Sequence, residues 1–180
     1  RFDLVDVQRQ MMTNLGQLIH RKAAEAFRSK DREAFTLHSG RFLGMLADMD
    51  TLLRTRSEYS FDRWLTEARS WGETEEEKNQ MERDATSLVT IWGADGDPRI
   101  FDYSWREWAG LINGYYLPLW QKFYTMLQQH LDEGTSYEEA GLPQIYGREA
   151  FRANDFYHTL AEWELSYVDT YGKARIPATE

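Results

Sequence analysis

Apolar side chains recur at spacings of three and four residues along most of the chain, which is the period of an amphipathic α-helix. The first stripe consists of Leu4, Val7, Met11, Leu15 and Leu18. It predicts a helix that runs to about Arg28, and a second stripe from Phe35 predicts another helix to about Arg56. Because only a short polar segment separates the two helices, we expect them to pair antiparallel.

Hydroxyl residues stand where three further helices are expected to begin. Ser60 suits an N-cap position, and Thr74 and Ser104 are each followed three residues later by a glutamate, which is the capping-box pattern. The apolar stripes behind these residues are Trp64, Leu65, Ala68 and Trp71; Met81, Ala85, Leu88 and Trp92; and Trp108, Ile112, Tyr115, Leu119, Phe123 and Leu127. Pro118 lies inside the last stripe and should kink or break that helix, because proline lacks a backbone N–H.

A final helix is expected near the end of the chain, after a short one that Ser136 with Glu139 begins and Gly141-Leu142-Pro143 ends. Its apolar face is Leu160, Trp163, Tyr167 and Tyr171, with Gly172 as C-cap. The sequence thus predicts an all-α fold, a multi-helix bundle of about six or more helices without significant sheet. We expect residues 1–175 to form one helical domain, residues 176–180 to form a tail, and the core to include Leu4, Leu15, Leu46, Leu88, Ile112 and Trp163.

Charge and composition exclude several classes of function. The chain has 30 acidic against 21 basic residues and a net charge of −9, so nucleic acid and anionic membranes are poor partners. The absence of cysteine excludes thiolate catalysis and disulfides, and no apolar run reaches the ~18 residues of a membrane span. The four histidines lack metal-ligand spacing, so we expect no metal and no cofactor. The acidic run 73–77 is interpreted as a helix start rather than a metal or catalytic cluster.

A Gly/Asp/Pro-rich loop over residues 91–103 is the strongest candidate for function. It carries Trp92 and Tyr103 at its two ends, and its composition disfavours a continuous helix. The rings can face a ligand, or they can fill the core beside an ordinary helix connection. In the aromatic pairs Trp105/Trp108 and Tyr115/Tyr116, at least one ring of each pair should lie near a surface or an interface, because both cannot face one way on the same helix.

Four stretches together resemble the C-terminal all-helical domain of the alpha-N-acetylglucosaminidases, glycoside hydrolase family 89. They are Asp3 to Gln10, Trp64 to Arg69, Trp92-Gly93 through Phe101-Asp102-Tyr103, and Leu111 to Trp120. The resemblance implies that the chain is a piece of a longer enzyme, with the two catalytic glutamates on a (β/α)8 barrel outside this chain. This fragment alone is then no enzyme, and no residue in it is catalytic. The resemblance further implies that the parent enzyme removes terminal alpha-linked N-acetylglucosamine from a glycan with retention of configuration.

The resemblance also implies which residues of this chain serve the substrate. Trp92, Ile100 and Tyr103 match the loop that this family places at the rim of the pocket, where they would contact the sugar. The partner of the domain is then the barrel of the same polypeptide, in a secreted, periplasmic or lysosomal enzyme. The alternative from another class is a stand-alone acidic helical-bundle module that binds a protein partner.

Overall fold

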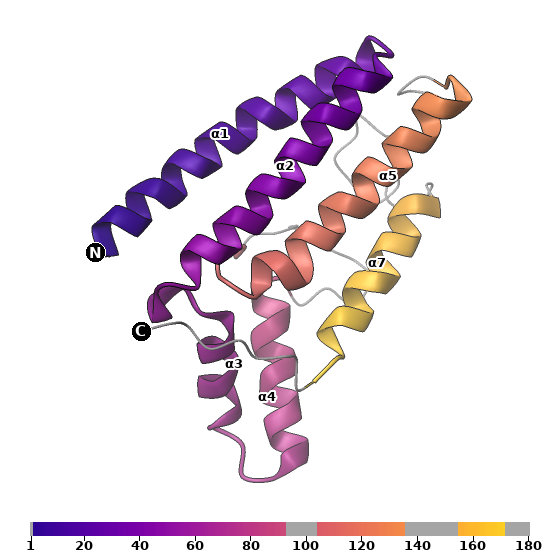
Figure 1. Ribbon diagram of the computed structural model, residues 1–180. Helices are drawn as coiled ribbons and strands as arrows, with labels where there is room; N and C mark the ends of the chain where they lie inside the picture. The colour runs from indigo at the N-terminus through magenta and orange to yellow at the C-terminus, as the bar shows by residue number, and fades with distance from the viewer. Residues whose placement is uncertain (1, 93–103, 136–154, 172–180) are drawn as a thin grey trace. The chain divides into compact units, whose positions relative to one another are not determined.

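The computed structural model describes residues 2–92, 104–135 and 155–171 (Figure 1). These residues form six α-helices and no strand; an isolated bridge links Ser60 and Ala109. The prediction of an all-α fold is confirmed. The elements fall into two compact units: α1, α2, η2 and α5 form the first, and η1, α3, α4 and α7 form the second. Among the described residues, no helix is both long enough and apolar enough to cross a membrane.

The first unit begins with the expected antiparallel pair, α1 (Phe2–Arg28) and α2 (Arg32–Leu53) (Figure 1). Lys30 turns the chain between them with a left-handed φ of 59°, and the N–H of Asp31 donates to the carbonyl of Ala26 at 2.9 Å. The Asp31 carboxylate then accepts the N–H of Ala34 at 3.0 Å, which caps α2. The short polar segment therefore ends one helix and starts the next.

The face of α1 that packs on α2 is not the predicted one. Small residues dominate the buried positions, which are Val5, Gly16, Ala23, Ala26 and Phe27. At Gly16 a Cβ atom would lie 2.7 Å from Cε of Met45, so the helices approach closely there. Leu4 and Leu15 are 69% and 50% exposed, and their assignment to the core is wrong. The small residues face α2 because they let the two helices pack closely, whereas leucines on this face would hold the helices further apart.

The third helix of this unit is α5 (Leu117–Glu133), which follows a π-helical turn, η2 (Ile112–Tyr116). Helix α2 lies between α1 and α5 (Figure 1). Pro118 stands in the first turn of α5, so the interruption expected there takes the form of the π turn. Ile112 is 2% exposed, as predicted for a core residue, and Leu46 on α2 is only half-buried.

Side chains from the α1–α2 turn stabilise the end of α5. Arg32 donates to the carbonyl of Leu131 at 2.8 Å, and Nζ of Lys30 donates to the carbonyl of Gly134 at 2.9 Å. Gly134 has a left-handed φ of 77° and ends the helix. The two cations thus bind carbonyls at the C-terminal end of α5, which is the negative end of the helix dipole.

An aromatic cluster joins all three helices of the first unit around His20. Its Nδ1 atom lies 2.8 Å from the hydroxyl of Tyr124, and its ring centroid lies 5.0 Å from that of Trp120 in an edge-to-face arrangement. Phe42 of α2 completes the cluster at 5.7 Å. Burial lowers the pKa of His20, and the charge of Arg28 adds to this effect.

The second unit contains a short 3-10 turn, η1 (Ser57–Tyr59), and the helices α3 (Phe61–Arg69), α4 (Glu75–Leu88) and α7 (Asp155–Val168). Ser60 caps α3 by accepting the N–H of Arg63, and Thr74 and Glu77 form a complete capping box at α4. Both predicted helix starts are confirmed. Leu88 is 45% exposed, so its assignment to the core is wrong; Trp163 is half-buried.

Candidate functional site

The first flank of the predicted loop is the segment that follows α4. The carbonyl of Ser87 accepts two N–H groups there, from Thr90 at 3.3 Å and from Trp92 at 2.7 Å. Trp92 has a left-handed φ of 52°, a conformation that costs free energy for a residue with a bulky side chain. Its side chain is not part of the helical stripe in which the sequence placed it, and the residue is 37% exposed.

The second flank runs from Ser104 to Gly110 and is bound to the start of α3. The N–H of Ala109 donates to the carbonyl of Tyr59 at 2.8 Å, and the N–H of Phe61 donates to the carbonyl of Ala109 at 3.1 Å. These bonds hold the segment in a non-helical conformation, so the helix start predicted at Ser104 is wrong. Gly110 then turns the chain with a φ of 89°.

Two tryptophans connect the second flank to the α3–α4 pair. The ring centroids of Trp64 and Trp108 lie 5.6 Å apart, and Nε1 of Trp64 donates to the carbonyl of Ala85 on α4 at 2.9 Å. Trp108 is half-buried, whereas Trp105 is 49% exposed. The expectation that one ring of this pair lies near a surface is confirmed, although the two residues are not on a helix.

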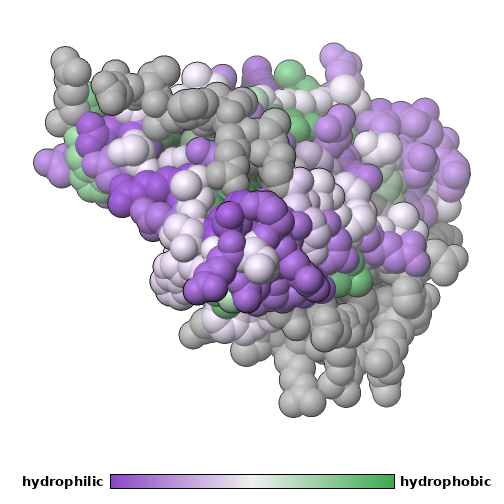
Figure 2. All heavy atoms as spheres, turned by 90° about the horizontal axis from the view of Figure 1, so that it is seen from below, coloured by the Kyte–Doolittle hydropathy of each residue, from purple (hydrophilic) through white to green (hydrophobic). Residues whose placement is uncertain are grey.

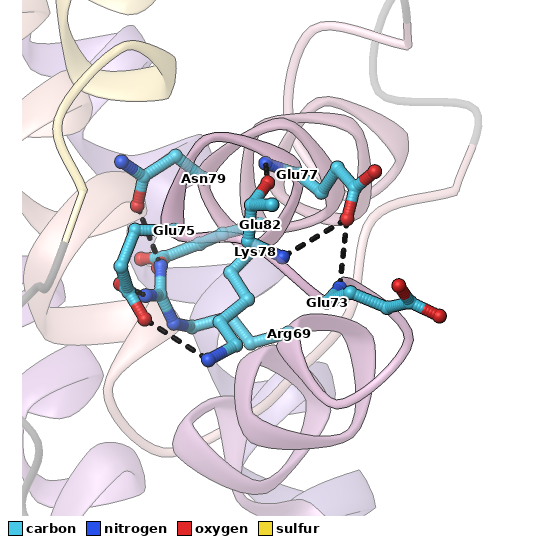
Figure 3. A network of polar contacts seen from close by, with 8 residues as sticks. Arg69, Glu73, Glu75, Glu77, Lys78, Asn79 and Glu82 are labelled. Carbon is cyan, nitrogen blue, oxygen red and sulfur yellow. Dashed lines mark hydrogen bonds and ion pairs between the residues drawn. The ribbon is translucent and has the colours of Figure 1, made fainter.

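Helices α3 and α4, which carry both flanks, are held together by Arg69 (Figure 3). Its guanidinium donates to Asn79 and Glu82 through Nη1 and to Glu75 through Nη2, each at 2.8 Å. Glu82 is fully buried, and its charge, after burial itself, raises the pKa of Tyr167 on α7. The flanks of the predicted loop therefore start from a helix pair that hydrogen bonds and ion pairs hold together.

The acidic run 73–77 is explained by the start of α4. Hydrogen bonds from the backbone N–H groups of Thr74 and Glu73 keep the pKa of Glu77 below its usual value, and the hydrogen bond from Lys78 does the same for Glu75. Seen from below, this end of the α3–α4 pair presents a mainly hydrophilic surface (Figure 2). In the described part of the chain, no three His, Asp or Glu side chains come together as a metal site would require.

Of the three residues predicted to serve a substrate, the structure describes Trp92; Ile100 and Tyr103 lie outside the described residues. A partly exposed indole is suited to pack on the apolar face of a sugar ring. Trp105, half exposed on the other flank, was not predicted as a site residue. The sequence does show Trp105 beside Trp108, but the helical interpretation of that segment concealed which ring faces outward.

Comparisons with known proteins all match alpha-N-acetylglucosaminidases or family 89 glycoside hydrolases. Residues 1–177 match the family described as the alpha-N-acetylglucosaminidase C-terminal domain. Human alpha-N-acetylglucosaminidase is 31% identical over 141 residues, which cover 77% of this chain and 19% of the human protein.

Solved structures from Clostridium perfringens give the same result. CpGH89 in complex with its substrate GlcNAc-alpha-1,4-galactose superposes with a TM-score of 0.77 at 28% identity, over 96% of this chain and 18% of that chain. A family 89 glycoside hydrolase in complex with PUGNAc gives a TM-score of 0.79 at 27% identity, over 99% and 19%. The present chain thus spans about a fifth of the length of these relatives.

Proposed function

The chain belongs to the family of alpha-N-acetylglucosaminidase C-terminal domains, and we propose that it is the non-catalytic helical domain of a retaining alpha-N-acetylglucosaminidase. In this proposal residues 1–175 pack against a catalytic (β/α)8 barrel of the same polypeptide, and residues 176–180 are a tail. The observation that carries the proposal is the family match over residues 1–177, in a chain that spans about a fifth of its relatives. The two catalytic glutamates then lie on the barrel.

The role of the domain at the active site is to supply part of the substrate pocket. Trp92, Ile100 and Tyr103 contact the terminal alpha-linked N-acetylglucosamine of a glycan in this proposal. Two observations support it: the ring-bearing residue at the described end of the loop is partly exposed, and a relative was solved with GlcNAc-alpha-1,4-galactose bound. The left-handed backbone of Trp92 costs free energy, and backbone strain of this kind clusters at sites that bind ligands.

The test compares the present chain with the whole polypeptide that its gene encodes. Both are assayed with a chromogenic alpha-N-acetylglucosaminide, and the anomeric configuration of the released sugar is followed by NMR. We expect the whole polypeptide to release the alpha-anomer first, as a retaining enzyme does, and the chain alone to give no turnover. Turnover by the purified chain, or a whole polypeptide without activity, would overturn the proposal.

A further inference from the structure

Helix α1 carries a second apolar stripe that the described residues of its own unit leave exposed. It consists of Leu4, Val7, Met11, Leu15 and Leu18, which are 69%, 57%, 65%, 50% and 53% exposed. At about 100° per residue, this stripe lies roughly 120° around the helix from the face that packs on α2. It extends about 21 Å along the helix axis, which is the length of a helix–helix interface.

The surroundings of this stripe resemble a protein interface more than a solvated surface. Of the 15 residues from Leu4 to Leu18, only Asp6 and Arg9 are charged, in a chain with 28% charged residues. These two charges neutralise each other in an ion pair at 2.8 Å. Beside the stripe, Nε2 of Gln10 donates to Oδ1 of Asn14 at 3.1 Å, so its border is made of uncharged amides. Depletion of charge around an apolar centre is typical of interfaces.

We infer that the stripe on α1 is the surface on which the part of the glycosidase polypeptide that lies outside this chain docks. This inference rests on the proposed function and adds to it the surface that is covered. The relatives contain about four-fifths of their length outside the matched segment, which is ample chain to cover one helix face. A lipid surface is a poorer occupant, because interfacial helices are rich in Lys and Arg on their polar face and this segment has only Arg9.

Methionine oxidation tests the inference without a substitution. The whole polypeptide is treated with hydrogen peroxide, natively and in urea, and oxidation of Met11 is followed by mass spectrometry, with fragment ions separating it from Met12. We expect native Met11 to react at least ten times more slowly than in urea, close to the rate of Met49, which is 2% exposed in the core. Native reaction within twofold of the urea rate would overturn the inference. Protection that grows with protein concentration would also overturn it, because a second copy would then be the occupant.

Matched variants of the whole polypeptide give a second readout. Leu15→Lys places a charge on the stripe, and Gln17→Lys places the same charge on an exposed position outside it. We expect Leu15→Lys to lower the melting temperature and to restore Met11 oxidation, and Gln17→Lys to do neither; equal behaviour of the two variants would overturn the inference. Activity on an alpha-N-acetylglucosaminide is measured in parallel. An unprotected Met11 in an active enzyme defeats only this inference, whereas a protected Met11 in an inactive polypeptide defeats only the proposed function.

Discussion

Nη1 of Arg69 lies 2.8 Å from Oε2 of Glu82, whose side chain is fully buried. Truncating one partner of a buried ion pair leaves the other charge without its compensation. We expect Glu82→Ala to lower the free energy of unfolding by about 3 kcal/mol, at the lower end of the range for buried pairs, because Arg69 keeps two other partners and is 20% exposed. Urea titration followed by circular dichroism measures the change.

Glu75 provides the matched control, since it binds the same guanidinium from an exposed position. Its side chain is 73% exposed, and exposed pairs contribute at most about 1 kcal/mol. Glu75→Ala should therefore cost much less than Glu82→Ala. Equal losses from the two variants would show that burial of Glu82 does not determine the strength of this contact.

His20 should make stability depend on pH. Its folded-state pKa lies below the ordinary value of 6.5, so the unfolded chain binds a proton at a higher pH than the folded protein does. The free energy of unfolding should fall as pH decreases below about 6.5, by at most about 1.4 kcal/mol per pH unit from this one group. Urea titrations at pH 7.5, 6.5 and 5.5 measure the slope.

The comparison variant for this prediction is His20→Gln, which cannot titrate but retains a polar group beside the hydroxyl of Tyr124. It should show a shallower loss of stability over the same pH range. If the two proteins lose stability in parallel, other groups account for the acid sensitivity and His20 has no part in it.

Close packing at Gly16 should make this position intolerant of a larger side chain. A Cβ atom there meets Met45, and a leucine must displace more than the flexible end of that side chain. We expect Gly16→Leu to destabilise the protein by about 1–3 kcal/mol. Gly44 on α2 has no atom within 4 Å of its Cβ position, so Gly44→Leu should be neutral or stabilising because leucine favours a helix. Thermal melts of both variants decide the point.

Trp92 should affect catalysis by the whole enzyme more than it affects folding. We expect Trp92→Ala to lower kcat/KM by about 5- to 150-fold, which corresponds to about 1–3 kcal/mol of lost transition-state stabilisation. Trp71, which is 81% exposed in the turn before α4, provides the control because Trp92 follows the opposite end of that helix. Trp71→Ala should leave kinetics unchanged; equal effects, or a loss that follows the melting temperature, would remove Trp92 from the pocket.

Tyr103 can serve the sugar through its ring or through its hydroxyl, and two substitutions separate these roles. If the ring carries the contact, Tyr103→Phe should retain nearly full kcat/KM while Tyr103→Ala loses it. If a hydroxyl hydrogen bond carries it, both variants should lose activity to a similar degree. Kinetics on an alpha-N-acetylglucosaminide with both variants at wild-type stability make the distinction, and full activity of both would exclude Tyr103 from the site.

The existence of the helices could be predicted from the sequence because the apolar period and the caps at Ser60 and Thr74 are local signals. Several buried positions could be predicted as well, among them Leu65, Ala85 and Ile112, but the buried face of α1 could not. Helix α1 has two apolar stripes with the same period, and only the position of α2 decides that the stripe of small residues, rather than Leu4 and Leu15, is covered. Tertiary packing is not encoded in the spacing of one segment.

The flanks of the candidate loop were predicted less well, for the same reason. The pattern from Ser104 to Glu107 satisfies a capping box, but hydrogen bonds between Ala109 and the distant residues Tyr59 and Phe61 impose another conformation. The glycines, aspartates and proline predict the loop itself, but its residues 93–103 lie outside the described part of the chain. The left-handed backbone of Trp92 could not be predicted from the sequence, because tryptophan has no preference for that conformation.

The π turn at Ile112–Tyr116 has a consequence for how sequences of this family are aligned. Each of its hydrogen bonds closes one residue later than in an α-helix, so the turn holds one surplus residue. The fully buried Asp50 accepts both the backbone N–H and the side-chain amide of Asn113 at 3.1 Å, which fixes the turn from outside. A relative that lacks one residue here has an ordinary α-helical turn instead, and the helix faces on both sides of the turn keep their orientation. Deletion of one residue within α5 would instead rotate every later side chain of that helix by about 100° about its axis.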